Sequence, residues 1–340
     1  MSTTRIVCFG EMLVRLTAPG REMLLQSPRL DVTIGGAEAN VAVSLARFGW
    51  DATMVTTLPD QALGHACRAQ LRYQGIDTRH VVMRPGRMGL YFLTPGAMQR
   101  PAEIIYDRAG SAFAATPADA YDWPALLEGA DWLHVGGITP AVSQHAEDAV
   151  LGAAEAAAKA GVKVSFDCNY RAKLWQERGG DAPAVFSRLA ACADLMFGNE
   201  RDIALILGAD FHNVPVEERF LAAAELAFKT WPKLQRMAST VRAHDDVDHQ
   251  ELTGRLVTRD HRVHLSRTFK MNGIVDRIGG GDAFAAGLIH AIERGMTADG
   301  AITFATAASV LKHSIPGDAN LVSVADVVSL VNDEALDVKR

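Results

Sequence analysis

The residues most capable of chemistry lie in one glycine-rich stretch, Asp276-Arg-Ile-Gly-Gly-Gly-Asp282. Gly279 to Gly281 run directly into a segment with helical apolar spacing, so their backbone N–H groups can converge on an anion at a helix start. Asp282 falls in the first helical turn, where a carboxylate can deprotonate a hydroxyl that attacks a bound phosphoryl group. The alternative is a flexible loop followed by a dipole-stabilising aspartate, and this stretch alone favours neither.

A second glycine motif lies far upstream, at Gly35-Gly-Ala-Glu-Ala-Asn40. Its two glycines allow close approach of a ligand, and Asn40 offers both a donor and an acceptor to a hydroxyl group. The alternative here is an ordinary strand-to-helix turn. Neither motif is a P-loop or a dinucleotide fingerprint, because no Gly-Lys-Ser/Thr and no strand followed by Gly-x-Gly-x-x-Gly occurs at them.

Charged and polar residues also follow predicted buried strands, where open α/β sheets place their ligands. Glu11 follows the strand predicted at residues 5–10, and Arg171 follows the strand at 162–167. Arg171 is placed to pair a substrate carboxylate through two hydrogen bonds, or else to form a structural salt bridge. Asn199 and Asp202 match a helix N-cap with a capping-box variant, and a second role near Mg²⁺ stays open.

The elements that must position these residues alternate between strand and helix. Strands are predicted at 5–10, 52–58, 81–83, 132–135, 162–167 and 194–197, and helices at 62–75, 146–160, 303–311 and 324–331. Two segments, about 12–34 and 84–113, break this rhythm with short β-like runs. We expect them to form a small β lid from which Tyr91, Tyr106 and Arg108 face a ligand, although a surface hairpin would have similar residues.

Residues 231–275 have the least regular pattern. Residues 237–241 resemble a strand, and the polar run from His244 to Gln250 is predicted to be a solvated loop. Histidine and aspartate alternate there, but their irregular spacing disfavours a metal site.

Composition narrows the class of protein. The chain has 340 residues, 49% of them hydrophobic, and a net charge of −6 without a Lys/Arg-rich run, which argues against nucleic acid and anionic membranes as partners. Four cysteines form no C-x-x-C pair, so we expect reduced thiols in a cytoplasmic protein. No apolar run approaches the roughly 20 residues that a membrane span needs.

Together the two glycine motifs resemble those of the ribokinase/PfkB family of sugar kinases, and the resemblance extends from about Val7 to Val331. Within the family the chain is most similar to the branch that acts on 2-keto-3-deoxygluconate (KDG). That closer similarity rests on Gly35-Gly-Ala-Glu38, Gly89-Leu-Tyr91, Tyr106 to Ala112, Gly137 to Pro140, Asp167 to Arg171 and Gly317-Asp318.

The resemblance implies a single ribokinase-like domain over residues 1–340, a three-layer α/β/α structure with a mostly parallel central sheet and a small β-sheet lid. It implies ATP and a small sugar acid as substrates, Mg²⁺ as cofactor, K⁺ or another monovalent cation as a possible further one beside the anion site, and a homo-oligomer through the lid. The alternatives are another sugar kinase of the fructokinase or ribokinase type and a non-catalytic sugar-binding sensor.

It also implies roles for individual residues. Asp282 is the expected catalytic base, with Gly279, Gly280 and Gly281 as the anion hole. Asn199, Gly279 and Gly281 are expected at the nucleotide. The expected substrate contacts are Gly35, Gly36, Asn40, Tyr91, Tyr106, Arg108, Ile138, Arg171 and Asp318. The pair of arginines suits a substrate with a carboxylate, which ribose and fructose lack.

The sequence departs from the family pattern at four places. The usual Gly-Ala-Gly-Asp is Gly279-Gly-Gly-Asp282 here, a change that keeps the backbone amides available. Asp202 stands where the family has a glutamate linked to Mg²⁺, so only a water-mediated metal role is expected for it. Glu11 replaces the aspartate that ribokinases use for sugar hydroxyls, which disfavours ribose. Residues 238–242 replace the family's Val-Lys-x-Gly strand, so its nucleotide contacts are not carried over.

Overall fold

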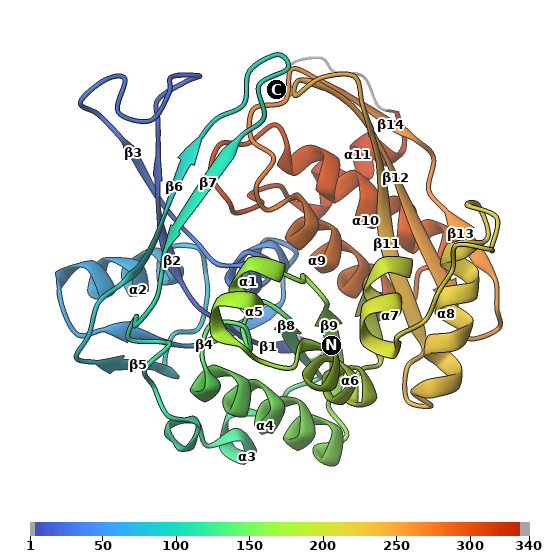
Figure 1. The fold of residues 1–340 in the computed structure, drawn as a ribbon, viewed down its shortest axis with the longest axis horizontal. Coiled ribbons are helices and arrows are strands. Elements are labelled where there is room, and N and C mark those ends of the chain that lie inside the picture. The colour runs from blue at the N-terminus through green and yellow to red at the C-terminus, as the bar shows by residue number, and fades with distance from the viewer. Residues whose placement is uncertain (1–3, 334–340) are drawn as a thin grey trace.

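The computed structural model describes residues 4–333, which form a large central sheet, helices on both of its faces and a smaller second sheet (Figure 1). The central sheet has ten strands in the order β13-β12-β11-β10-β9-β8-β1-β4-β5, with β14 paired to β12. The strands are β1 (Arg5–Phe9), β4 (Asp51–Pro59), β5 (Val81–Arg84), β8 (Trp132–Gly136), β9 (Lys163–Asp167), β10 (Leu195–Phe197), β11 (Arg236–His244), β12 (His249–Thr258), β13 (Val263–Leu265) and β14 (Phe269–Asn272).

The strands from β11 through β5 are parallel, and β12, β13 and β14 are antiparallel. Buried apolar runs explain the central strands, since both faces of a parallel sheet are covered by helices. Residues 6–9 of β1, 52–59 of β4 and all of β8 are buried. The predicted α/β class with a mostly parallel sheet is therefore confirmed.

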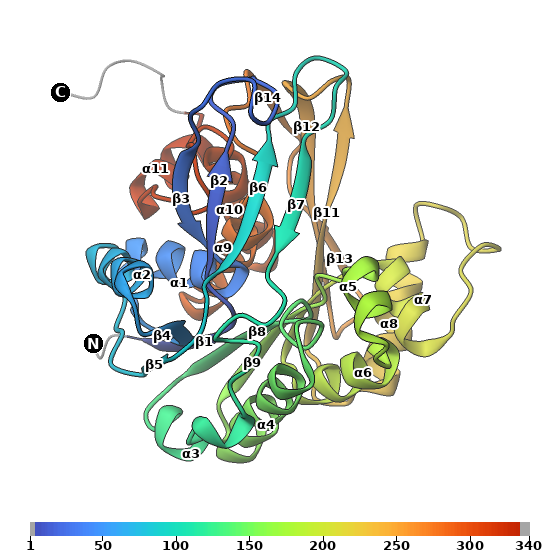
Figure 2. The same ribbon diagram turned by 60° about the vertical axis from the view of Figure 1, so that its left-hand side comes forward.

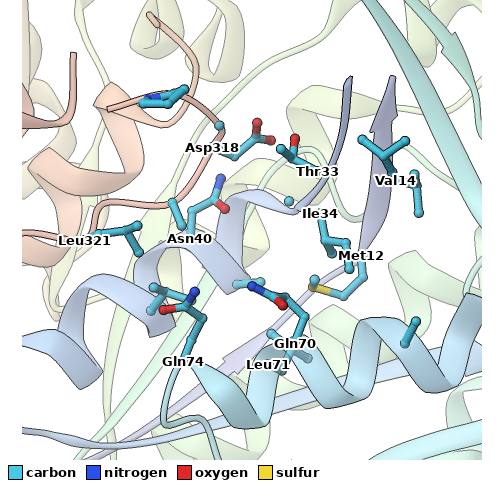
Figure 3. Close-up of a pocket in the computed structure, with 18 of the residues that line it drawn as sticks. Met12, Val14, Thr33, Ile34, Asn40, Gln70, Leu71, Gln74, Asp318 and Leu321 are labelled. Carbon is cyan, nitrogen blue, oxygen red and sulfur yellow. The ribbon is translucent and has the colours of Figure 1, made fainter. Parts of the chain in front are cut away.

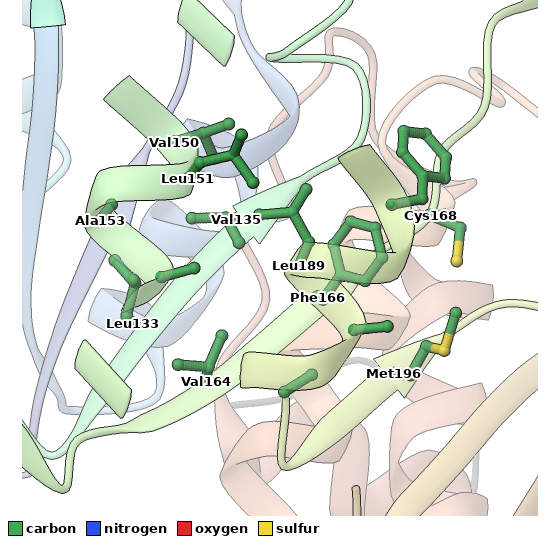
Figure 4. Packing of buried hydrophobic residues seen from close by; sticks show 14 of the residues in the cluster. Leu133, Val135, Val150, Leu151, Ala153, Val164, Phe166, Cys168, Leu189 and Met196 are labelled. Atoms are coloured by element: carbon green, nitrogen blue, oxygen red, sulfur yellow. The ribbon is translucent and has the colours of Figure 1, made fainter. Parts of the chain in front are cut away.

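Two hydrophobic layers separate the sheet from its helices. One layer lies under α3 (Trp123–Leu126), α4 (Gln144–Ala160), α6 (Ala182–Cys192), α7 (Glu200–Leu207) and α8 (Arg219–Thr230). Figure 4 shows part of this layer, with Phe166 of β9 packed among residues of α4 and α6. The other lies under α1 (Ala37–Arg47), α2 (Ala62–Tyr73), α9 (Gly280–Glu293), α10 (Ala298–Lys312) and α11 (Val324–Val331). The short helix α5 (Ala172–Arg178) follows β9.

The second sheet stands beside α9 and α10 and has the strand order β3-β2-β6-β7 (Figure 2). Its strands are β2 (Leu13–Thr17), β3 (Asp31–Gly35), β6 (Gly89–Thr94) and β7 (Glu103–Asp107). They come from the two segments in which the sequence breaks the strand–helix alternation, so the predicted small β sheet is confirmed. Its closing movement as a lid stays a prediction.

The register of the second sheet gives it two different faces. Cross-strand neighbours share a face, and Thr33, Arg15, Tyr91 and Tyr106 form one such row across the four strands. The next row, Val32, Leu16, Phe92 and Ile105, lies on the opposite face and is entirely apolar. Val32 is 62% exposed and Ile105 49% exposed. The inner face therefore carries a polar row, and the outer face carries an apolar row.

The prediction for the polar run from His244 to Gln250 is wrong at both of its ends. His244 is the last residue of β11, His249 is the first of β12, and only residues 245–248 form the turn. The first residues of β12 are polar on both faces of the strand, so they lack the alternation of apolar and polar residues that indicates a strand. Gln250 is nevertheless buried. Strands β12, β13 and β14 had no prediction, and α10 begins at Ala298, five residues before the predicted start.

Three further expectations concern the cysteines, metal ions and the membrane. All four cysteines are free thiols, as predicted from their spacing. Among residues 4–333 no group of three or more His, Cys, Asp or Glu side chains is arranged to hold a metal ion. Within the same residues, no helix has the length and apolar character needed to cross a bilayer.

Candidate active site

A cavity of about 290 Å³ lies between the inner face of the second sheet and the start of α9. It brings together residues that are far apart in the chain, including both predicted arginines and the glycine stretch. Of the predicted site residues, those that line it are Gly36, Asn40, Tyr91, Tyr106, Arg108, Ile138, Arg171, Gly279, Gly280, Gly281, Asp282 and Asp318. The spatial clustering that the sequence predicted is thus present.

The three glycines at the start of α9 are required for different reasons. Gly279 is the helix N-cap with φ of 82°, and a side chain there would overlap the carbonyl oxygen of Asp318. A Cβ at Gly280 would stand 2.6 Å from the imidazole of His313. A Cβ at Gly281 would meet no protein atom within 4 Å, because this residue faces the open cavity. The helix start therefore presents bare backbone to a ligand.

Asp282 lies in the first turn of α9, as predicted, and points its carboxyl group toward α1. The side-chain amide of Asn40 donates a hydrogen bond of 2.7 Å to Asp282 Oδ2. Desolvation raises the pKa of Asp282 to about 8, the bond from Asn40 opposes this, and the carboxylates of Asp167 and Glu38 add to the increase. A carboxylate with this pKa is a stronger base than an ordinary aspartate.

Glu38 is a second buried carboxyl group of the site, which sequence analysis did not assign. Thr139 Oγ1 donates a hydrogen bond of 2.9 Å to Glu38 Oε1, and burial raises the pKa of Glu38 to about 7. Its carboxyl group occupies the space that side chains at Gly10 and Gly136 would fill, at the carboxyl ends of β1 and β8. The sequence feature that could have identified Glu38 as a site residue is its position within the first glycine motif.

The two predicted arginines have different surroundings. Arg108 is buried and forms an ion pair with Glu11, with its Nη2 2.5 Å and its Nε 2.8 Å from Glu11 Oε2. Ser111 also donates to Glu11, while Nη1 of Arg108 has no hydrogen-bond partner among the described residues. Arg171 is exposed, and its Nη1 donates a hydrogen bond of 3.3 Å to the carbonyl oxygen of Tyr170. Both guanidinium groups therefore retain N–H groups for a ligand.

Asp318 connects the second sheet to the glycine stretch. Its carboxylate accepts hydrogen bonds from Tyr91 Oη at 2.6 Å and Arg15 Nη1 at 2.7 Å. Arg15 Nη2 lies 2.6 Å from Asp276, the first residue of the glycine stretch. These three charged groups are all buried, so the inner face of the sheet is tied to the loop before α9.

A neighbouring cavity of about 320 Å³ shares Asp167, Asn169, Arg171 and Gly281 with the first. It is lined further by Asn199, Asp202 and residues 238–240 of β11. The predicted capping box is confirmed, since Asp202 Oδ2 accepts the backbone N–H of Asn199 at 2.8 Å and the Asn199 side chain caps α7. Two compartments therefore meet at the glycine helix, as a transfer between two substrates requires.

A third cavity, of about 370 Å³, lies behind the first glycine motif between β2, β3 and α2 (Figure 3). It is mostly apolar, and Gly35 lines this cavity and not the first one. A side chain at Gly35 would overlap the carboxylate of Asp318. Gly35 therefore leaves space for the side chain of Asp318. The sequence motif alone does not show whether a glycine serves this packing role or contacts the substrate.

Sequence analysis assigned no role to several other residues of the cavity lining. Arg277 is exposed and lines the first cavity from within the glycine stretch itself. Asp167 and Asn169 lie at the end of β9, two positions apart, where strand-end reasoning had selected Arg171 alone. The available signal was the glycine stretch itself for Arg277, and the run Asp167 to Arg171, on which the closer family resemblance rests, for Asp167 and Asn169.

The fold and this pair of cavities agree with the sugar kinase expected from the sequence, and comparison with known proteins identifies the family. The chain belongs to the pfkB family of carbohydrate kinases, whose model matches residues 3–323. The 2-dehydro-3-deoxygalactonokinase of Haloferax volcanii is 31% identical over 327 residues, covering 96% of each chain.

Two solved structures are similarly close. The 2-dehydro-3-deoxygluconokinase of Thermotoga maritima superposes with a TM-score of 0.91 at 36% identity, covering 97% of this chain and 99% of the other. A PfkB family carbohydrate kinase of Listeria grayi gives a TM-score of 0.90 at 32% identity, with coverage of 97% and 100%. The predicted family and its ribokinase-like fold are therefore confirmed.

Proposed function

We propose that this kinase transfers the γ-phosphoryl group of ATP to the terminal hydroxyl of KDG, giving 2-keto-3-deoxy-6-phosphogluconate, with Asp282 as general base. The observation that carries the proposal is that Arg108 and Arg171 line one cavity with Asp282 and the glycine helix start. A substrate that bears a carboxylate at one end and a primary hydroxyl at the other matches this arrangement.

In this proposal Asp282 takes the proton of the hydroxyl as that oxygen attacks the phosphoryl group. Asn40 holds the Asp282 carboxylate in place through its 2.7 Å hydrogen bond. The backbone N–H groups at Gly279 to Gly281 stabilise the charge on the transferring group, and the positive end of the α9 dipole adds to this. The second cavity, beside Asn199, receives the remainder of the nucleotide.

The residues present fit Mg²⁺ as a partner of the nucleotide. Asp167 and Asp202 supply carboxylate oxygens beside the second cavity, and such hard ligands suit this ion. One oxygen of Asp202 is engaged by the backbone of Asn199, which favours the water-mediated contact expected from the sequence. When bound, the ion neutralises charge on the phosphates.

A second candidate substrate is 2-keto-3-deoxygalactonate, since the relative from Haloferax volcanii is named for that sugar acid. Both acids would use the same arginines. A neutral sugar such as fructose or ribose would leave the Nη1 group of Arg108 buried without a partner, which disfavours those substrates. A non-catalytic sensor has no need for a desolvated carboxylate beside an anion-binding helix start.

The test is a panel of sugars and sugar acids assayed with ATP and Mg²⁺ by coupled ADP release. We expect the two keto-deoxy acids to give kcat/KM at least about tenfold above fructose and ribose, from one charge-assisted contact. Fructose or ribose as the best substrate would overturn the sugar-acid proposal, and no ADP release with any compound would favour the sensor.

We also propose a homo-oligomer through the second sheet. The apolar row on its outer face supports this contact, because Val32 and Ile105 are exposed and lie on the two edge strands, β3 and β7. Light scattering on the wild type and on Ile105→Glu tests this: we expect the substitution to lower the molar mass to that of one chain. A wild-type monomer would contradict the proposal.

A further inference from the structure

Lys312, the last residue of α10, is a fully buried lysine that the proposed mechanism does not use. Its Nζ donates hydrogen bonds to two backbone carbonyl oxygens, that of Ile315 at 3.0 Å and that of Asp276 at 3.4 Å. Its Cε lies 3.3 Å from the position that a Cβ of Gly279 would take. A positive charge is thus held directly behind the anion-binding helix start.

The surroundings of this ammonium group are those of a bound cation. Burial lowers the pKa of Lys312 and the guanidinium group of Arg15 adds to this decrease, whereas the carboxylates of Asp276, Asp318 and Asp282 oppose it and favour the charged form. Backbone carbonyl oxygens and nearby carboxylates are also the groups that bind alkali cations, and an ammonium ion carries the same single charge. An additional monovalent cation does not fit here, because Lys312 already occupies these carbonyl groups.

The loop that Lys312 contacts leads directly into the anion hole. Asp276 Oδ1 accepts the N–H of Ile278 at 3.0 Å, and its Oδ2 accepts the N–H of Gly317, also at 3.0 Å. The backbone N–H of Asp276 donates to the carbonyl oxygen of His313 at 3.2 Å, and the carbonyl oxygen of Asp276 accepts from Lys312. Fixing both ends of Asp276 fixes the path of the chain into Gly279.

We propose that Lys312 is a built-in substitute for a monovalent cation: a positioning residue that holds the loop 276–279 in its anion-binding form and makes the kinase independent of K⁺. The inference takes from the proposed function that residues 279–282 bind the phosphoryl group. It differs from the expectation, drawn from the resemblance, that K⁺ is a possible cofactor.

The first test needs no variant. The wild type is assayed with the best sugar of the panel in K⁺, Na⁺ or tetramethylammonium chloride at one ionic strength, and we expect kcat to agree within about twofold across the three salts. A more than fivefold requirement for K⁺ would overturn the inference while leaving the sugar kinase itself intact. The absence of turnover in every salt would instead refute the proposed function.

The second test compares two substitutions of Lys312. Lys312→Ala removes the charge and opens space, and we expect kcat in tetramethylammonium to fall about tenfold, less than the ~10²–10³-fold that direct loss of an anion-hole donor costs. K⁺ or NH₄⁺ should restore most of this loss, with KM for the sugar little changed. Lys312→Met fills the space with a neutral chain, so neither ion should restore it. The exposed Lys270→Met is the matched control.

A third measurement does not depend on turnover. Because a ligand that binds only the folded protein stabilises it, K⁺ or NH₄⁺ should raise the Tm of Lys312→Ala above its value in tetramethylammonium. For the wild type, Lys312→Met and Lys270→Met, the Tm in K⁺ or NH₄⁺ should equal the Tm of the same protein in tetramethylammonium. Equal loss of kcat in all salts, with no rise in Tm, would show Lys312 to be purely structural and would overturn the inference.

Discussion

Helix α9 is buried at every residue from Ala283 to Ala291, whereas β7, across the cavity, is exposed at all five of its residues. Residues 279–282 form one wall of the cavity, the glycine wall, which presents backbone groups held in place by the surrounding residues. The sheet wall, formed by Tyr91, Ile104, Tyr106 and Arg108, is built from side chains on a thin sheet. The contrast suggests that the first wall determines the reaction and the second wall selects the substrate, and each of the following predictions tests that division.

The largest effect is expected at the glycine wall. Asp282→Asn should lower kcat by about 10²–10⁴-fold, the range typical of general-base help, with little change in ATP binding. Because desolvation disfavours the charged carboxylate, the neutral amide should not lower the Tm. Coupled ADP release and a thermal melt measure both quantities. A variant that kept more than about a tenth of kcat would move the base elsewhere.

The glycines of the same wall should come next. Gly281→Ala places a methyl group in open cavity and should fold normally, yet lower kcat by about 10²-fold, close to the cost of an anion-hole donor. Gly280→Val should also lower the Tm, because its side chain meets His313. For both, calorimetry without nucleotide should find sugar binding less affected than turnover. Equal losses in binding and turnover would contradict a specific phosphate site.

Substitutions at the arginines should affect the sugar acid alone. A charge-assisted bond contributes roughly 1.5–3 kcal/mol, so Arg171→Ala should raise KM for KDG about tenfold to a hundredfold. Arg171→Lys should recover part of this, since an ammonium group lacks the planar pair of donors. Any slow phosphorylation of fructose should barely change. Proportional loss of both activities would assign Arg171 a structural or nucleotide-linked role.

Arg108→Ala should raise KM for KDG to a similar extent, and it should also lower the stability of the fold. It leaves Glu11 buried without its partner, a change that costs about 3–5 kcal/mol in comparable buried pairs. Its Tm should therefore fall, whereas that of the exposed Arg171→Ala should not. Thermal melts of the two variants side by side make this comparison, and equal Tm values would show that the Glu11 pair contributes no stability.

The smallest predicted effect is that of pH on the wild type. Asp282 acts as a base only when ionised, and its pKa is raised to about 8, so the active fraction increases as the pH rises toward that value. From pH 7 to pH 8, kcat/KM for the sugar acid should rise about fivefold, corresponding to the increase in ionised carboxylate. A profile that is flat between pH 6.5 and 8.5 would contradict the raised pKa.

The two walls also differ in how well the sequence predicted them. The helix start, its first-turn Asp282 and the second sheet could be predicted because glycine runs, helical spacing and strand alternation are local signals. The Glu11–Arg108 pair could not, because it joins residues 97 positions apart. Gly35 was predicted as a contact, but its role depends on the position of Asp318, which only the fold defines.

The buried pair of Glu11 and Arg108 has a consequence for how substrate preference changes in evolution. A lineage that loses the arginine first retains an unpaired buried carboxylate, and one that loses the glutamate first retains an unpaired buried guanidinium. We therefore expect each single step to lower the stability of the fold before any new substrate is gained. Under the proposed function, conversion to a neutral-sugar kinase would therefore need both residues to change together or a stabilising mutation to come first.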